Sequence, residues 1–471
     1  METYKNILAQ LNETIWDSAE LKFCEHKSAN AMTELLKAEG FTVVKGIADM
    51  ETSYTASYGS GHPIIGILGE YDALSGLSQQ ADVAVRTPRE GTECGHGCGH
   101  NLLGTAAVGA ALYLRDYLKE SRKSGTVVMV GCPAEEGGSG KAYLARAGVF
   151  DSLDVALTWH PAGGNAVMTG SLQANCQAYF RFKGISSHAA ATPHLGRSAL
   201  DAVELMNVGV NYLREHMEPT DRIHYAVTDT GGISPNVVQG HAEVLYLVRS
   251  TQSDKVQKLY QRVCDVARGA ALMTGCQMEI VFDKACSNIL SNSVLEQLLY
   301  DSMTEVSLPQ YSAEDMDYAN RFKATITQED IGGDLSLMAV SGMEKSDAVT
   351  RYAQSPMVDF VLPHCHLDIN IPGSSDVGDA SHVVPTAQFV AACYAPGTPG
   401  HSWQMVAQGK SDIALKGALY AAKVLANGGQ KIIDNPEIAQ KAQDEFKKSM
   451  GGNKYQCPIP PQIKPNSNAA K

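Results

Sequence analysis

Three short apolar segments, each followed at once by side chains that can take part in chemistry, constrain this sequence most strongly. Residues 63–69, 126–132 and 154–159 have the character of buried strands, and stretches with helical spacing separate them. Strands that alternate with helices predict an α/β fold whose mixed, mostly parallel sheet is covered by helices. Because ligands bind beyond the carboxyl ends of such strands, the residues that follow these segments are the first candidates for a functional site.

The middle of the chain has a different pattern. From residue 176 to residue 288, the expected order of strand, helix, strand, strand, helix, strand is the ferredoxin-like α+β arrangement. The sequence therefore predicts a catalytic domain in two parts, an inserted lid or dimerisation domain between them, and a poorly ordered tail rich in Pro, Asn and Lys. The expected boundaries are residues 1–175 and 289–450 for the catalytic domain, 176–288 for the insert and 451–471 for the tail.

Composition excludes several classes of partner. The formal net charge of −13 makes nucleic acid or an anionic membrane an unsuitable partner, because both favour clustered Lys and Arg. The 11 cysteines are odd in number and lack the spacing of a disulfide framework, so we expect reduced thiols. No apolar run reaches the roughly 18 residues of a membrane span, and the N-terminus lacks the apolar core of a signal peptide. These features lead us to expect a cytoplasmic protein.

The segment Gly-His-Gly-Cys-Gly-His-Asn at residues 95–101 places a thiol and two imidazoles between glycines, just before a predicted helix. Cys98 and His100 are good ligands for zinc and related ions. A flexible Gly-rich turn is the alternative, since Cys-x-His is less specific than paired Cys-x-x-Cys motifs. A phosphate-binding loop is disfavoured because no Gly-Lys-Ser/Thr follows, and a Cys nucleophile is a weak interpretation because its base would normally come from a distant part of the chain.

Two more groups follow the apolar segments. Glu135 and Glu136 come directly after the second segment, where adjacent carboxylates in apolar surroundings need a cation or a proton. His160 follows the third segment. Each could be structural, a solvated loop or an isolated strand-end histidine, but together they favour one functional site at the carboxyl ends of the strands.

In this order, the segments resemble the binuclear aminoacylase and carboxypeptidase family of amidohydrolases. The resemblance spans essentially residues 1–430. It rests on Asp72 after the first strand, the Gly-His-Gly-Cys-Gly-His-Asn segment at 95–101, Pro-Ala-Glu-Glu at 133–136, Trp-His-Pro at 159–161, Ser-Ser-His-Ala-Ala at 186–190 and Pro-Gly-His-Ser-Trp at 399–403.

The resemblance implies a role for each residue at a matching position. Two divalent ions, zinc or manganese, are expected, with Cys98 bridging them. Glu135 is expected to be the general base, and Asp72 to orient a metal ligand. The expected metal ligands are Cys98, His100, Glu136, His160 and His401. The implied reaction is hydrolysis of the amide bond of N-acyl or N-aroyl amino acids, with p-aminobenzoyl-glutamate as the first substrate to try.

Three residues of the inserted domain match with less specificity. His188 corresponds to a lid histidine that reaches a neighbouring subunit's active site in relatives and could stabilise an oxyanion there. Asn236 and Arg249 fall on positions that hold a substrate carboxylate, although Asn236 could cap a turn and Arg249 could pair with a surface acid. The resemblance thus implies a homodimer, or a heterodimer with a homologous subunit, formed through the lid domain.

The sequence also departs from the family pattern. The usual His-x-Asp is Glu70-Tyr71-Asp72 here, which shifts the expected metal ligands toward Cys98 and His100. Thiolate favours zinc, whereas a carboxylate-rich site admits manganese. His364 and His366 lie on one face of a predicted strand, but the resemblance assigns them no role, and none is assigned to His96 or His194.

Three alternatives remain beside the leading interpretation. The same site could hydrolyse small dipeptides, because the pocket of the lid is not readable from sequence. The chain could be a subunit that is active only with a homologous partner. A purely structural metal site would require four closed ligands, whereas five candidate ligands and a free carboxylate favour open coordination.

Overall fold

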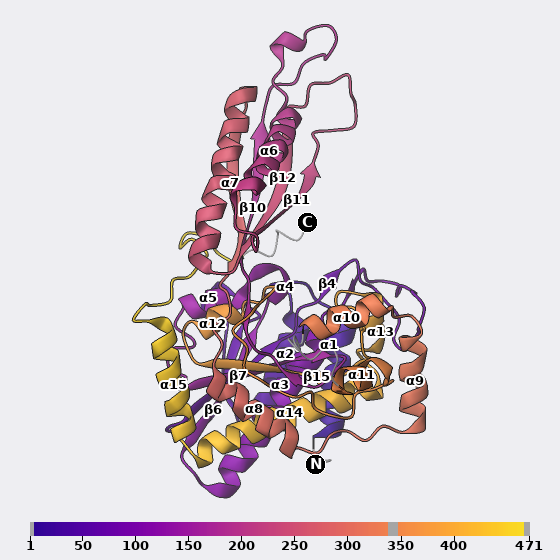
Figure 1. Cartoon of the computed structure of the whole chain (residues 1–471), viewed down its shortest axis with the longest axis vertical. Helices are drawn as coiled ribbons and strands as arrows, with labels where there is room; N and C mark the ends of the chain where they lie inside the picture. Colours follow the sequence, from indigo (N-terminus) through magenta and orange to yellow (C-terminus); the bar gives the residue numbers. More distant parts are fainter. Residues whose placement is uncertain (1–3, 338–346, 466–471) are drawn as a thin grey trace.

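The computed structural model describes residues 4–337 and 347–465. A seven-stranded sheet forms the centre of the catalytic domain (Figure 1). In spatial order its strands are β1 (Thr42–Lys45), β2 (Tyr54–Ser60), β6 (Gly125–Cys132), β3 (Ile64–Glu70), β7 (Val155–Ala162), β15 (Thr386–Ala392) and β8 (Ala166–Val167). The four strands β6, β3, β7 and β15 run parallel, and antiparallel strands flank them. The predicted mixed, mostly parallel sheet is confirmed.

Both faces of this sheet are buried. In β3, Ile67 packs into the larger hydrophobic core, whereas its neighbour Leu68 packs into a second core on the opposite face. This explains why the strand is apolar throughout. Helices of the larger core are α1 (Lys5–Ser18), α2 (His26–Ala38), α3 (His100–Ser121), α8 (Ser293–Glu305), α14 (Asp412–Asp434) and α15 (Glu437–Met450), and the second core includes α5 (Gly140–Arg146) and α12 (Val377–Ser381).

The lid domain, as we call the lobe formed by residues 174–286, projects from the catalytic domain (Figure 1). It has its own hydrophobic core and an antiparallel sheet in the order β11-β12-β10-β13. This is the predicted ferredoxin-like arrangement. Its elements are β10 (Ala174–Lys183), α6 (Ala199–Leu213), β11 (Arg222–Asp229), β12 (His241–Ser250), α7 (Ser253–Thr274) and β13 (Gln277–Cys286).

Shorter elements complete the described part of the chain. They are η1 (Ile47–Asp49), β4 (Leu74–Ser75), β5 (Cys94–Gly95), α4 (Glu135–Gly138), β9 (Ser171–Leu172), η2 (Pro193–Leu195), η3 (Arg214–His216), α9 (Ala313–Lys323), α10 (Gln328–Leu337), α11 (Asp347–Gln354), β14 (Asn370–Ile371) and α13 (Trp403–Gln408). Among the helices of the described residues, none combines the length and apolar character needed to cross a membrane.

Two sequence-based expectations differ from the structure. Residues 364–366 do not form a strand, because their imidazoles turn to the buried carboxylate of Glu296 instead of alternating across a sheet. The tail, expected to be poorly ordered, packs against the catalytic domain over its described part. Tyr455 donates a hydrogen bond to Asp379, and Ile459 is buried in the second core. Residues 466–471 lie outside the described residues.

Candidate metal centre

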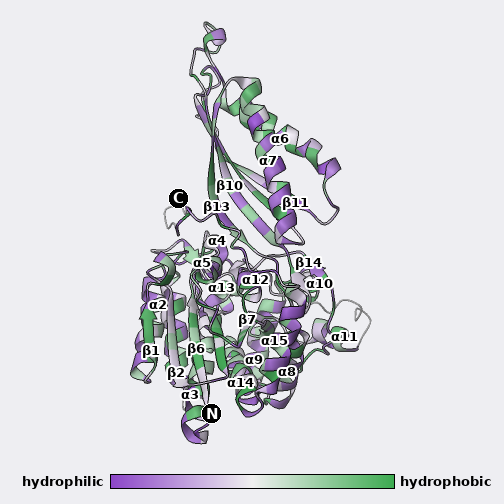
Figure 2. Ribbon diagram, turned by 90° about the vertical axis from the view of Figure 1, so that its left-hand side faces the viewer, coloured by the Kyte–Doolittle hydropathy of each residue, from purple (hydrophilic) through white to green (hydrophobic). Residues whose placement is uncertain are grey.

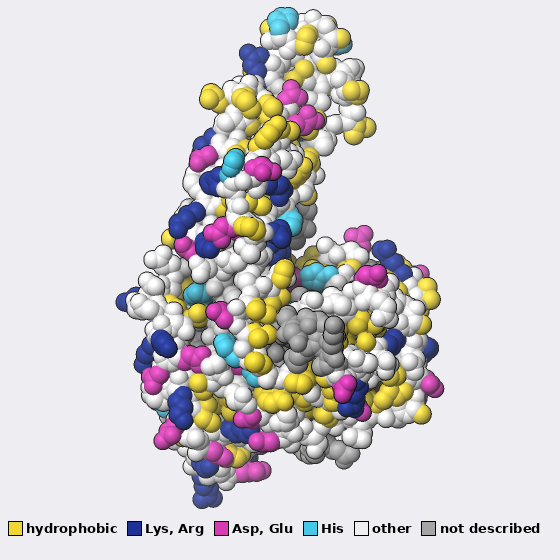
Figure 3. Space-filling model, in the orientation of Figure 1, with side chains coloured by type: hydrophobic (Ala, Val, Ile, Leu, Met, Phe, Trp, Pro, Cys, Tyr) yellow, Lys and Arg dark blue, Asp and Glu magenta, His cyan; other side chains and the backbone are white. Residues whose placement is uncertain are grey.

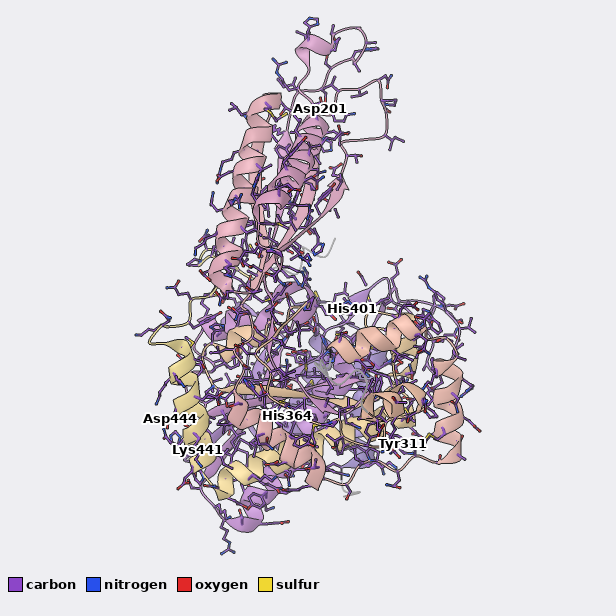
Figure 4. The ribbon with its side chains drawn as sticks, viewed as in Figure 1. Asp201, Tyr311, His364, His401, Lys441 and Asp444 are labelled. Atoms are coloured by element: carbon purple, nitrogen blue, oxygen red, sulfur yellow. The ribbon has the colours of Figure 1, made fainter. Side chains whose placement is uncertain are left out.

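The predicted site residues of the catalytic domain converge at one edge of the central sheet. Parallel strands place their carboxyl ends at the same edge. Asp72 follows β3, the Glu135 and Glu136 pair follows β6, and His160 lies near the end of β7. His401 comes from the connection between β15 and α13, at the end of the catalytic domain that faces the lid domain (Figure 4).

Cys98, His100 and His160 form a first donor cluster, whose ligand atoms all lie within 4.8 Å of one another. The Cys98 Sγ is 3.4 Å from His160 Nε2. Burial and Glu136 would raise the pKa of the Cys98 thiol, but the imidazoles of His160 and His100 outweigh them and lower it to about 6. The cluster therefore favours the thiolate, which is the form that binds metals.

Cys98, Glu136 and His401 form a second donor cluster within the same distance limit. His401 Nε2 is 3.4 Å from Glu136 Oε1, a buried oxygen without a hydrogen-bond partner in the described residues. The neighbouring Cys98 and Glu136 raise the pKa of His401 to about 10, so this group of atoms attracts positive charge. Since Cys98 belongs to both clusters, its sulfur is placed to bridge two cations.

Asp72 orients a member of each cluster. Its Oδ1 is 2.9 Å from His100 Nδ1, and its Oδ2 accepts a hydrogen bond of 2.9 Å from the backbone N–H of Glu136. The contact fixes the His100 ring, so that Nε2 is left without a hydrogen-bond partner in the described part of the chain. Cys, His and Glu are ligands that zinc and manganese accept, and the buried donor atoms fit an ion at each cluster.

Glu135 lies beside the clusters in an environment suited to proton transfer. Burial raises its pKa well above the ordinary value, and the carboxylates of Glu70, Asp376 and Glu136 raise it further. A carboxylate with increased proton affinity can accept a proton from water and return it to a leaving group near neutral pH.

The Glu135–Glu136 turn has a strained backbone that distant side chains hold. Ala134 and Ser139, on either side of α4, have φ values of 61° and 56°, which are unusual for residues other than glycine. Lys22 donates a hydrogen bond to the carbonyl of Gly137 at 2.8 Å, and Lys284 of β13 donates one to the carbonyl of Glu136 at 2.8 Å. The lid domain thus contacts the turn directly through Lys284.

The three predicted residues of the lid domain do not join the donor clusters of their own chain. The strand pairing places Ala174 and Ser250 together at the base of the lid and Lys183 and His241 at its far end. His188, which follows Lys183, is exposed in a loop at that far end.

Asn236 lies beside this loop, since its carbonyl accepts a hydrogen bond from Ala189. Arg249 is instead near the base of the lid, half-buried, and donates to the Ser374 hydroxyl at 2.9 Å. The alternative of a surface acid as the partner of Arg249 is wrong for the described residues, because no carboxylate there forms an ion pair with it.

The other histidines have structural contacts. His96 is buried and contacts the carbonyl of Ile15 at 3.0 Å, whereas His194 is exposed in the lid domain. The ring of His366 lies 2.8 Å from Glu296, and His364 lies 3.6 Å from the same carboxylate. These two imidazoles therefore share an acid and belong to neither donor cluster.

A buried charge network behind the first cluster could not be identified from the sequence. Lys141 Nζ lies 2.5 Å from Glu70 Oε1 and 2.6 Å from Asp376 Oδ1, and all three side chains are almost completely buried. Glu70 is visible in the sequence as a carboxylate at the end of a strand. Asp376 is 235 positions from Lys141, so no local pattern joins the two.

Comparisons with known proteins agree with this geometry. A sequence model of peptidase family M20/M25/M40 matches residues 66–463. The chain is 44% identical over 467 residues to one of the subunits of p-aminobenzoyl-glutamate hydrolase from Escherichia coli K12, covering 99% of this chain and 97% of that one. It is 33% identical over 285 residues to Xaa-Arg dipeptidase of Mus musculus, covering 58% and 62% of the two chains.

Solved structures share the fold. An aminobenzoyl-glutamate utilization protein from Klebsiella pneumoniae superposes with a TM-score of 0.57 at 16% identity, covering 88% of this chain and 96% of that one. YXEP of Bacillus subtilis, described as a dinuclear metal-binding peptidase, superposes with a TM-score of 0.54 at 16% identity, covering 90% and 99%. At these identities, the superpositions establish the architecture alone.

Proposed function

The chain belongs to peptidase family M20/M25/M40, and we propose that it hydrolyses the amide bond of N-acyl or N-aroyl amino acids at a binuclear metal centre. The first candidate substrate is p-aminobenzoyl-glutamate, which the name of the 44% identical relative contains. Hydrolysis would release p-aminobenzoate and glutamate.

The observation that carries the proposal is the pair of donor clusters joined at Cys98, with Glu135 beside them. The first cluster adds His100 and His160, and the second adds Glu136 and His401. Two divalent ions, zinc or manganese, would there polarise the amide carbonyl and lower the pKa of a water molecule. Thiolate and imidazole favour zinc, and the carboxylate admits manganese.

Glu135 performs the proton transfers in the proposed mechanism. It takes a proton from the water that attacks the amide carbonyl, and it then gives this proton to the leaving nitrogen. The neighbouring Glu70 and Asp376 carboxylates increase its affinity for the proton, which suits the first step. Asp72 keeps the His100 ring and the Glu136 backbone in place throughout.

The lid domain is proposed to complete the site of a second subunit. His188 and Asn236 lie at its exposed far end, where they can reach another chain and meet an oxyanion or a substrate carboxylate there. Arg249, half-buried beside Ser374, offers a guanidinium to a carboxylate near the base of the lid.

Exposed apolar side chains support contact between subunits through the lid domain. Val208 and Tyr212 of α6 are 52% and 74% exposed, and Tyr225 and Val227 lie on the edge strand β11. Figure 2 shows hydrophobic residues along α6, and Figure 3 shows hydrophobic side chains on the lid surface and a hollow between the lid and the catalytic domain. The second subunit is another copy or a homologous chain, as the word subunit in the relative's name suggests.

The Glu135→Gln variant tests the mechanism. The amide keeps the shape of the side chain but cannot accept the proton, so turnover should fall by roughly 100- to 10,000-fold while both ions remain bound. Glu296→Gln is the matched control, because Glu296 is a buried glutamate outside both donor clusters. Wild-type turnover in the Glu135 variant would rule out its role as base.

A dipeptidase is the second candidate function, and the likeness to Xaa-Arg dipeptidase favours it. It would use the same centre with a different lid pocket. The ratio of kcat/KM for p-aminobenzoyl-glutamate to kcat/KM for Xaa-Arg dipeptides distinguishes the two functions. If both values rise only after a homologous chain is added, the protein is a subunit that depends on its partner.

A further inference from the structure

Three buried carboxylates face a single lysine behind the first donor cluster. Glu70 and Asp376 contact Lys141 at 2.5 Å and 2.6 Å, and the charges of Glu70, Asp376 and Lys141 all act on Glu135. Asp376 uses both of its oxygens, since the second accepts a hydrogen bond from the Lys141 backbone. Buried charges are stable only when they are compensated, so one lysine leaves this region in need of a further cation.

The second oxygen of Glu70 points toward the metal centre. Its Oε2 lies 3.2 Å from His100 Nε2, and both side chains are at most 4% exposed. This contact is not a hydrogen bond, because His100 Nε2 has no hydrogen-bond partner in the described residues. With the Nδ1 proton directed to Asp72, Nε2 carries a lone pair, and so does the Glu70 oxygen. Two such atoms repel each other unless a cation binds both.

The separation also fits two ligands of one ion. Bonds of about 2.0–2.1 Å that meet at roughly 100° place two ligand atoms about 3.2 Å apart. Ligand atoms of Glu70, His100 and Glu135 also all lie within 4.8 Å of one another, so this carboxylate reaches the same region as the first donor cluster. Glu70 is therefore close enough to share the ion of that cluster.

We propose that Glu70 is a further protein ligand, binding through Oε2 the ion that Cys98, His100 and His160 hold. Lys141 binds the other oxygen, fixes which oxygen faces the ion and balances the added negative charge. The first ion then has four protein ligands in a buried setting. The second has three, one of them His401 with a 57% exposed side chain, so the first ion should bind more tightly.

This inference rests on the proposed binuclear function, and metal binding tests it apart from activity. The purified full-length chain is dialysed against zinc or manganese alone, and bound ions are counted per chain. Wild type should bind two ions, and Glu70→Gln should bind one of them at least about tenfold more weakly. Gln keeps an acceptor for Lys141, and Glu296→Gln again serves as the matched control, because Glu296 is buried beside two imidazoles.

Cobalt substitution provides a second measurement. Loss of a ligand lowers the coordination number, so the visible absorption of the cobalt-loaded Glu70→Gln variant should change in intensity, and that of Glu296→Gln should match wild type. Glu70→Asp keeps the charge but withdraws the oxygen by one methylene, so it should also bind the first ion more weakly.

The outcomes separate the two proposals. Wild-type affinity for both ions and an unchanged cobalt spectrum in Glu70→Gln would overturn the ligand role, even if turnover fell, and would leave the binuclear centre intact. Wild-type protein that binds fewer than two ions would overturn the proposed centre itself, and the role of Glu70 with it.

Discussion

Replacement of Lys284 by methionine should lower activity, although Lys284 is placed outside both donor clusters. Its ammonium group donates a hydrogen bond to the Glu136 carbonyl from a strand of the lid domain. The turn that it holds is flanked by Ala134 and Ser139 in left-handed conformations, each of which costs on the order of 1–3 kcal/mol. Met keeps most of the side-chain volume and removes the donor, so the strained turn loses one of its supports.

The expected size follows from the hydrogen bond. A bond from a charged donor contributes about 1.5–3 kcal/mol, and about 1.4 kcal/mol corresponds to a tenfold change in rate. If the bond holds Glu135 and Glu136 in their active positions, kcat/KM for p-aminobenzoyl-glutamate should fall by about 10- to 150-fold. The loss should appear mainly in kcat, because the turn carries the base. Lys284→Arg, which keeps a charged donor, should recover part of it.

The control is Lys258→Met, since Lys258 is an exposed lysine of the lid domain paired with Asp254. Surface pairs of this kind contribute little, so this variant should match wild type. Steady-state kinetics with the metal content of each protein gives the comparison. A Lys284→Met enzyme with wild-type kcat/KM would refute the idea that the lid domain supports the catalytic turn.

Three further predictions concern the metal bridge, the effect of pH on stability, and assembly. Cys98→Ser replaces a thiolate by a poor ligand, so metal analysis should find that at least one of the two ions is lost, together with turnover; two ions at wild-type affinity would contradict the bridge. Burial raises the pKa of Asp379 to about 7, above the ordinary 3.8, so the folded state favours its protonated form. The free energy of unfolding should therefore fall by up to roughly 4 kcal/mol as pH rises from 4 through 7. Urea unfolding should show a weaker dependence in Asp379→Asn, and an equal slope in both proteins would count against it. Tyr212→Glu, on the exposed face of α6, should shift the protein toward the monomer in analytical ultracentrifugation; an unchanged mass would exclude this face from the interface.

The fold was predictable because its central strands are buried on both faces. β3, β6 and β7 appear in the sequence as continuous apolar runs, and the carboxyl-end rule then brings Asp72, Glu136 and His160 together. The lid domain was equally visible, since its strands and helices follow one another in a known order.

The remaining features depend on long-range contacts. The support of the catalytic turn by Lys22 and Lys284 joins residues 115 and 148 positions apart. The segment around His364 has a strand-like sequence, but Glu296 attracts its imidazoles and no neighbouring strand among the described residues pairs with it. The tail orders against the catalytic domain because Ile459 and its neighbours find an apolar surface that only the folded chain provides.

The most direct test of the central claim is the release of glutamate from p-aminobenzoyl-glutamate by the purified chain, with its bound ions counted in the same sample. We predict release when two zinc or manganese ions are bound, loss of release with a chelator, and recovery when metal is returned. Release that persists in metal-free protein, or that survives Glu135→Gln, would contradict hydrolysis at a binuclear centre with Glu135 as the base.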